Sequence, residues 1–470
     1  MRTRVIALAC TAALLSACGS LQTPYERPAL DLPAAWEQTG ASATRAADVS
    51  RDPWWQGFGD TRLTSLMKAV LERNNDLAAA ALRVRQAQLQ AGLTDENRRP
   101  TFGGSVGANR SQALDGGGSN RSYSASVGVS YELDLWGRLA RESDAAQWTA
   151  QATEQDRHSA ALALVGTTTR LYWQLGYLNQ RLDSGAASLA DARRTRELVQ
   201  AQYDAGAVSG LELREAEQGV LSQQVALEQL QQQRVETRHA LALLLDVAPS
   251  EAALQRWLPE EPDTLNAARL PDVAAGLPAD LLARRPDLRA AEARLQATLA
   301  SGDATRASYY PSLSLTGSLG SASTALGTLL SNPVAALGAS LALPLLNQQR
   351  MRLDGERAQA QYDEAAVNFR QTLYTALGEV EDALSARTRL AAQAALLERQ
   401  LATAREVERL YETRYRAGAA TLKLWLDAQQ QRRSAELALA ENRFNRLAGQ
   451  VTLYQALGGD ARGDASAPNA

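Results

Sequence analysis

Few side chains in this sequence could act as catalytic acids, bases or nucleophiles. Its only histidines are His158 and His239, and both fall within stretches of helical periodicity, where a histidine is usually packed or solvated. Residues 103–107 read Gly-Gly-Ser-Val-Gly and match the G-x-S-x-G pattern of a hydrolase nucleophile, but they lie in a strand pattern rather than at a strand-to-helix turn. We therefore expect no catalytic, cofactor-binding or metal-binding site, and no enzyme activity.

The two cysteines predict lipid attachment instead of redox or metal chemistry. Arg2 and Arg4 precede an apolar run that ends in Leu-Ser-Ala-Cys at Cys18, the pattern of an exported bacterial lipoprotein. Cleavage would remove residues 1–17, including Cys10, and leave an acylated Cys18 at the new N-terminus. The mature chain would then hold one cysteine and no disulfide. An ordinary cleaved signal with an incidental cysteine is the alternative.

Composition favours a helical protein that does not bind nucleic acid. The 470 residues include 49 Lys and Arg against 52 Asp and Glu, spread evenly, so no basic face is available. Aromatic residues are only 5%, and the apolar share is mostly Ala and Leu interleaved with Gln, Arg and Glu, which favour helix. After residue 20 no run of 18 apolar residues occurs, so membrane residence would need strands.

Two regions of alternating sequence predict a β-hairpin between helices. Residues 61–98 have helical spacing, and then residues 102–108 and 123–135 alternate apolar side chains with Ser and Gly across a glycine-rich loop. A sandwich strand in a soluble protein would alternate in the same way. The Ser and Gly face suits a wet lumen, and Trp136 and nearby tyrosines suit an aromatic girdle, so we expect lipid on the apolar face.

A long proline-free helix is predicted next, from Arg138 to about Asp204, and it would measure roughly 100 Å. Ala-Gly-Ala at Gly206 breaks it, and a further helix runs from about Leu211 to Asp246. Five prolines then make residues 248–279 irregular.

The whole series repeats. Asp76 matches Asp287, Pro100 matches Pro311 and Gly206 matches Gly418, so each landmark recurs after 211 or 212 residues. A second long helix is expected over about 347–416. We divide the chain into a signal peptide (1–17), an extended N-terminal tether (18–60), a first repeat (61–247, hairpin about 100–136), an irregular equatorial segment (248–279), a second repeat (280–458, hairpin about 311–346) and a disordered tail (459–470).

The strand count predicts oligomerisation. Two hairpins give four strands per chain, whereas bacterial outer-membrane barrels need at least about eight, and an eight-stranded barrel is filled by side chains. Three chains would give a 12-stranded barrel with an aqueous lumen. The expected fold is therefore mainly α with a transmembrane β-barrel contribution, in which the duplicated units form a trimeric 12-stranded β-barrel and an α-helical periplasmic barrel.

Four segments carry a resemblance to a known family: residues 54–60 (Trp-Trp-Gln-Gly-Phe-Gly-Asp), 131–138, 285–292 and 309–315. They resemble the signature segments of the TolC-like outer membrane efflux proteins, in their lipoprotein (NodT-type) branch, from about residue 22 to 458. The resemblance implies a homotrimeric outer-membrane channel, lipid-anchored at Cys18 and extending into the periplasm. It also implies docking onto a periplasmic adaptor and an inner-membrane pump, commonly of the resistance nodulation division type, which drives export of drugs, other small toxic compounds or metal ions.

The resemblance further implies that the two helix breaks, Tyr203 to Leu211 and Tyr415 to Leu422, form the periplasmic entrance and adaptor contact. Some relatives carry an acidic gate residue just after the second glycine, where this chain has Ala419 and Ala420. The nearest charges that could replace it belong to Asp204, Arg414 and Arg416, beside Gly206 and Gly418.

The alternative function is a periplasmic coiled-coil adaptor or scaffold lipoprotein without a membrane barrel.

Overall fold

A computed structural model describes residues 21–37, 53–112, 114, 119–265, 270–271, 273, 276 and 278–459. Cys18 and the predicted tail from residue 460 onward lie outside these ranges. The main elements in chain order are η2 (Trp54–Phe58), α2 (Thr61–Arg73), α3 (Asn75–Glu96), β1 (Thr101–Gln112), β2 (Ser119–Leu133), α4 (Arg138–Asp204), α5 (Gly210–Leu244), α6 (Glu251–Gln255), α7 (Leu281–Arg284), α8 (Pro286–Ala307), β3 (Ser312–Ser323), β4 (Val334–Ala342), α9 (Gln348–Arg416) and α10 (Leu422–Ala456).

The long helices α4 and α9 occupy the ranges predicted for them, but the predicted helix 61–98 is interrupted. Asn74 has an extended backbone (φ −62°, ψ 126°), and its side-chain oxygen accepts a hydrogen bond from the Leu77 amide at 3.0 Å. This local bond caps the start of α3 and replaces a helical bond, which is why the helix divides there.

Two compact units make up the chain, and each draws on both sequence repeats. One unit contains residues 1–30, 81–156 and 287–372, and the other contains residues 31–80, 157–286 and 373–470. The first holds the sheet and α8; the second holds α2, α5 and α10. No helix in the described ranges is both long enough and apolar enough to cross a membrane.

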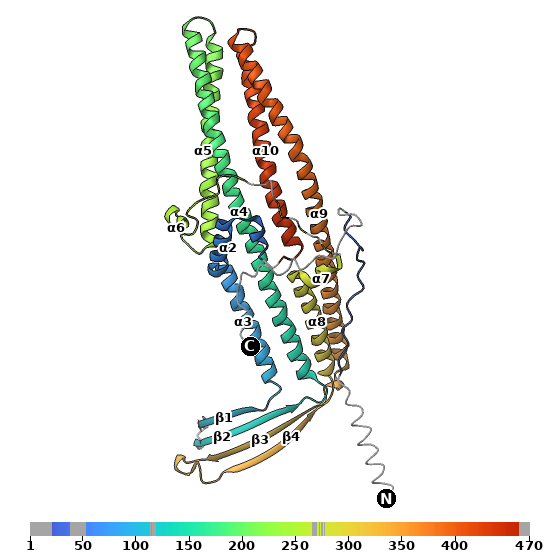
Figure 1. The fold of residues 1–470 in the computed structure, drawn as a ribbon. Helices are drawn as coiled ribbons and strands as arrows, with labels where there is room; N and C mark the ends of the chain where they lie inside the picture. The colour runs from blue at the N-terminus through green and yellow to red at the C-terminus, as the bar shows by residue number, and fades with distance from the viewer. Residues whose placement is uncertain are drawn as a thin grey trace. The chain divides into compact units, whose positions relative to one another are not determined.

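The sheet of the first unit is fully antiparallel, with the strand order β1-β2-β3-β4 (Figure 1). Phe102 lies opposite Val129, and Leu315 lies opposite both Tyr131 and Ala339. Because side chains alternate between faces, these apolar residues share one face, while Ser105, paired with Ser126, lies on the other. The sheet is therefore apolar on one side and polar on the other, as the alternation predicted.

The segment 131–138 forms the junction between β2 and α4. The carboxylate of Asp134 accepts hydrogen bonds from the amides of Leu139 (3.1 Å) and Ala140 (2.8 Å), which caps the helix. Gly137 takes a left-handed conformation (φ 76°), and Trp136 donates its indole N–H to the Pro311 carbonyl at 2.9 Å. These bonds fix the direction in which the helix leaves the strand.

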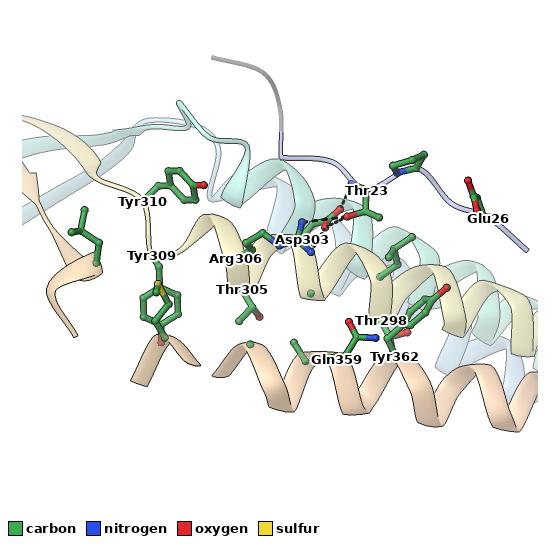
Figure 2. A pocket seen from close by; sticks show the side chains of 17 residues that line it. Thr23, Glu26, Thr298, Asp303, Thr305, Arg306, Tyr309, Tyr310, Gln359 and Tyr362 are labelled. Carbon is green, nitrogen blue, oxygen red and sulfur yellow. Dashed lines mark hydrogen bonds and ion pairs between the residues drawn. The ribbon is translucent and has the colours of Figure 1, made fainter. Parts of the chain in front are cut away.

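Residues 21–32 have no regular secondary structure, but side chains of α8 hold this N-terminal segment in place. The backbone N–H and the hydroxyl of Thr23 both donate to the carboxylate of Asp303, each at 2.7 Å, and Asp303 is only 2% exposed (Figure 2). Tyr25 and Arg27 both donate to Glu292. Beside this N-terminal segment, residues of α8 and α9 line a cavity of about 720 Å³. Polar partners on α8 therefore hold a segment that lacks its own secondary structure.

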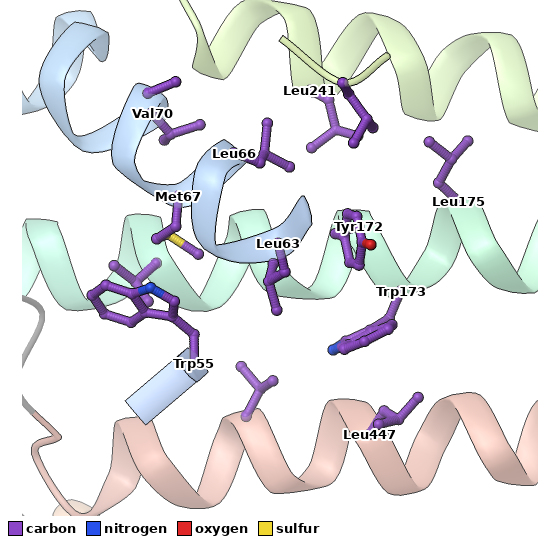
Figure 3. Packing of buried hydrophobic residues seen from close by; sticks show 14 of the residues in the cluster. Trp55, Leu63, Leu66, Met67, Val70, Tyr172, Trp173, Leu175, Leu241 and Leu447 are labelled. Atoms are coloured by element: carbon purple, nitrogen blue, oxygen red, sulfur yellow. The ribbon is translucent and has the colours of Figure 1, made fainter. Parts of the chain in front are cut away.

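The later part of the predicted tether belongs to the core of the second unit. Trp54 and Trp55 are buried in one apolar cluster with Leu63 and Met67 of α2, and Figure 3 shows Trp55 beside Met67. The expectation that all of residues 18–60 forms an extended tether is thus wrong for this part, because its tryptophans supply large apolar surfaces to a core of leucine, valine and aromatic side chains.

Asp60, the last residue of the tryptophan-rich segment, connects two helices of this core. One carboxylate oxygen accepts from the Arg62 amide at 2.9 Å and caps α2, while the other accepts from the Tyr172 hydroxyl at 2.7 Å. Burial and this bond raise the pKa of the Tyr172 phenol. The segment 54–60 is therefore a packing element.

Arg285, in the segment 285–292, holds the end of α10. Its buried guanidinium forms an ion pair with Glu379 (2.6 Å) and donates to the Ala456 carbonyl (3.0 Å). Gly458 ends the chain's last helix with φ 74°, and a β-carbon there would lie 2.9 Å from the carbonyl carbon of Arg284. Only glycine fits this position without a shift of the backbone.

Gly458→Ala should destabilise the second unit. The left-handed conformation alone costs an alanine about 1–2 kcal/mol, and the contact with Arg284 adds to this. Thermal unfolding of the purified protein measures the effect. Gly219→Ala is the matched control, because Gly219 lies within α5 with nothing within 4 Å of a β-carbon and should gain about 0.5–1 kcal/mol. Equal melting temperatures for the two variants would contradict the packing described.

Candidate functional site: the two helix tips

Both helix breaks have the same backbone structure. At the end of α4, Ala207 N–H donates to the Gln202 carbonyl (2.8 Å) and Gly206 N–H to the Tyr203 carbonyl (2.9 Å), with Gly206 at φ 71°. At the end of α9, Ala419 and Gly418 repeat these bonds at 2.8 and 2.9 Å, with Gly418 at φ 72°. Both are Schellman turns, in which a glycine takes the left-handed conformation that ends the helix.

The helices that follow the breaks begin differently. Ser209 caps α5 in a capping box: its hydroxyl accepts from the Leu211 amide at 3.2 Å, and Glu212 accepts from the Ser209 amide at 2.8 Å. The hydrogen bonds from Ser209 lower the pKa of the Glu212 carboxyl. Thr421, the corresponding residue of α10, makes no side-chain cap. The first tip is therefore fixed more firmly than the second.

A small apolar cluster joins the two tips. It contains Val199, Leu213 and Ala216 from the α4–α5 hairpin and Tyr415, Leu422 and Trp425 from the α9–α10 hairpin. The ring centroids of Tyr415 and Trp425 are 5.3 Å apart. Figure 1 shows the two hairpins ending at the same end of this unit. The breaks that are 212 residues apart in sequence thus form one surface.

Polar bonds across the hairpins extend this contact. The Tyr415 hydroxyl donates to the Gln202 side-chain oxygen at 2.5 Å, and burial raises the pKa of the Tyr415 phenol, so it stays protonated as a donor. Further from the tips, the Gln429 amide donates to the Thr195 hydroxyl at 3.4 Å. These bonds link α9 and α10 to α4, and separating the hairpins would have to break them.

Further from the tips, Arg432 of α10 adds ion pairs to neighbouring helices. It forms ion pairs with Glu408 and with Glu436 (2.7 Å), and its guanidinium lies 3.6 Å from Asp191 of α4. Burial raises the pKa of the Glu408 carboxyl, opposed by the charge of Arg432. The arginine is therefore compensated within the second unit.

The charges predicted at the tips lie on this surface, and none reaches from one tip to the other. Asp204 accepts from Gln200 at 2.8 Å within α4, and Arg416 pairs with Glu412 at 2.7 Å within α9. The Arg414 side chain has no hydrogen bond or ion pair to any residue that the structure describes. All three residues are exposed at the helix ends.

The bond between Tyr415 and Gln202 was not predicted from the sequence. Tyr203 and Tyr415 occupy equivalent places in the two repeats, three residues before their glycines, yet Tyr415 is 7% exposed and Tyr203 is 44% exposed. No local signal distinguishes them, because the difference arises from contacts between the hairpins. In the described ranges, no group of three or more His, Cys, Asp or Glu could hold a metal ion.

Comparison with known proteins decides the family. The family model for the outer membrane efflux protein matches residues 66–246 and 277–459, and these two stretches follow the two repeats. The chain belongs to the outer membrane efflux protein family. It is an efflux channel subunit, and the alternative of an adaptor or scaffold lipoprotein is set aside.

Relatives of this family match almost the whole chain. The pyoverdine export outer membrane protein OpmQ of Pseudomonas aeruginosa is 33% identical and covered over 96% of both chains. The cation efflux system protein CusC of Escherichia coli is 30% identical, with 96% of this chain and 97% of CusC covered. A solved structure of CusC has a TM-score of 0.81 at 28% identity, covering 94% of this chain and all of that one. The outer-membrane channel OprN gives a TM-score of 0.82 at 26% identity, covering 94% and 99%.

Tyr415→Phe should raise the conductance of the reconstituted channel. Removing the hydroxyl deletes the bond to Gln202, worth about 0.5–1.5 kcal/mol, and so loosens the contact between the tips. Tyr203→Phe is the matched control and should leave conductance unchanged, since Tyr203 is exposed. Equal conductances for the two variants would show that the Tyr415 bond does not hold the entrance.

Proposed function

We propose that three copies of this chain form a passive exit duct across the outer membrane. A periplasmic adaptor and an inner-membrane pump of the resistance nodulation division type complete the export system. The observation that carries this proposal is the four-stranded sheet, which is apolar on one face, polar on the other and open at both edges. Twelve strands from three chains close a barrel with a wet lumen, whereas four cannot close.

The lipid anchor at Cys18 is a second part of the proposal. Thr23 is held by Asp303, and the five residue-to-residue steps from Cys18 to Thr23 can span at most about 18 Å. Asp303 lies in the last turns of α8, nine residues before β3 begins at Ser312. An acylated Cys18 would therefore reach the membrane surface close to the base of the sheet.

The entrance and the adaptor contact are assigned to the tip surface. Gly206 and Gly418 give each tip a tight turn with exposed backbone, and Asp204, Arg414 and Arg416 supply charge around it. We propose that Asp204 and Arg416 also narrow the entrance in place of the acid that Ala419 and Ala420 lack. In the conductance assay, Asp204→Ala or Arg416→Ala should then change the ion selectivity as well as the conductance. Tyr415→Phe should change the conductance alone.

The exported compound is set by the pump in this proposal. Relatives at similar identity bear names that mention different cargoes: pyoverdine for OpmQ, toluene for a TtgC of Pseudomonas putida at 33% identity, and cations for CusC. A duct that admits whatever the pump delivers needs no selective pocket. We therefore place drugs, other small toxic compounds or metal ions within its range.

Cell fractionation and native mass measurement test the assembly. Wild-type protein should be found in the outer membrane as heat-modifiable trimers. Cys18→Ser should remain in the membrane fraction, because a closed barrel inserts through its own apolar surface, although it lacks the lipid. A soluble Cys18→Ser protein would contradict the barrel, and a membrane-bound monomer would contradict the trimer.

Gly206→Val and Gly418→Val test the tips. A left-handed β-branched residue costs at least about 1–2 kcal/mol, so the docking conformation should become roughly 5- to 30-fold rarer and efflux should fall while trimers persist. Ala205→Val and Ala417→Val add the same bulk at neighbouring positions without positive φ and should have a smaller effect. Normal efflux from both glycine variants would mean that the tips do not dock in this way.

A further inference from the structure

Only three charged residues occur in the four strands: Arg110 in β1, and Arg121 and Glu132 in β2. Glu132 lies near the helical end of the sheet, where Arg138 donates to both of its oxygens at 2.8 Å. Arg110 and Arg121 lie near the other end, directly opposite each other in the β1–β2 register. One end of the hairpin is therefore charge-compensated, and the other has two adjacent cations.

The two arginines belong to the apolar face. Along that face the register pairs Phe102 with Val129 and Ala108 with Tyr123, and the next pair on the same side is Arg110 with Arg121. The arginines thus follow directly after a tyrosine, as charged groups follow an aromatic girdle at a membrane boundary.

The position of the two arginines along the strands agrees with a membrane boundary. Arg110 is eight residues beyond Phe102, which is about 27 Å along a strand. At a strand tilt of about 40°, this corresponds to roughly 20 Å across the membrane, comparable with an apolar band about 25 Å tall. The pair therefore lies where acyl chains give way to headgroups, on the side away from the helices.

The pair lacks compensation among the residues that the structure describes. Neither guanidinium has a hydrogen bond or ion pair there, both side chains are exposed, and like charges directly opposite in a sheet destabilise each other. An anion between them would remove this repulsion. Two planar guanidinium groups on adjacent strands match the oxygens of a phosphate group, which arginine binds in a bidentate manner.

We propose that Arg110 and Arg121 form a clamp for the phosphate of an outer-leaflet lipid headgroup. A lipid is favoured over free phosphate because the apolar column below the pair, from Tyr123 to Phe102, is available to the acyl chains of the same molecule. The inference rests on the proposed insertion of the sheet in the outer membrane. A trimer would carry three such clamps around its rim.

Native mass spectrometry of the full-length trimer tests the clamp, with bisphosphorylated lipid A as the probe. Wild-type trimers should retain this lipid, and Arg110→Gln/Arg121→Gln should lower retention about tenfold, equivalent to about 1.4 kcal/mol. Arg110→Lys/Arg121→Lys keeps the charge without the planar fork and should retain an intermediate amount. All three proteins should remain trimeric, since no described bond within the chain is lost.

Three results would overturn the clamp: equal retention by the glutamine variant, equal retention of dephosphorylated lipid A, or displacement of the lipid by inorganic phosphate at the same concentration. The last would identify a phosphate site without a lipid preference. Each result would be obtained with intact trimers, so it would leave the proposed function standing. Absence of wild-type trimers from the outer membrane would instead overturn the proposed function and the clamp with it.

Discussion

The open edges of the sheet are the constraint on which the rest of the structure depends. β1 and β4 each pair with one neighbour only, so one side of each strand presents unpaired backbone N–H and C=O groups. In hydrocarbon each such group costs several kcal/mol, and a lone four-stranded sheet is therefore excluded from lipid. Joining edge to edge with other copies removes the cost. The helices continue from the strands and so take on whatever symmetry the strands adopt.

Three polar residues of the recognisable segments stabilise this architecture. Asp60 and Asp134 cap helices and connect them to neighbouring elements, and Arg285 fastens the end of α10. Each lies at a junction where the chain changes direction. Accuracy at these junctions sets the path of the duct's lumen, so the recognisable segments contribute helix caps and packing contacts.

The sequence was informative wherever one local pattern determines the structure. Proline-free runs and isolated glycines located α4, α9 and the two breaks, because helix continuation and left-handed termination are local properties. It failed at Asn74, where a side-chain cap overrode a continuous apolar period. It also failed for the contacts of Thr23 and of Tyr415, whose partners are 280 and 213 residues away. Such pairings depend on how the helices pack, and composition carries no record of them.

The unequal environments of Tyr203 and Tyr415 have a consequence for stoichiometry. Because each chain has two similar tips, a trimer would have six. The buried tyrosine and the uncapped Thr421 occur in only one of the two tips of each chain. The ring of tips is therefore threefold and not sixfold. Identical partner subunits that met such a ring would encounter two kinds of contact surface in alternation, so chemically equal subunits would be held differently.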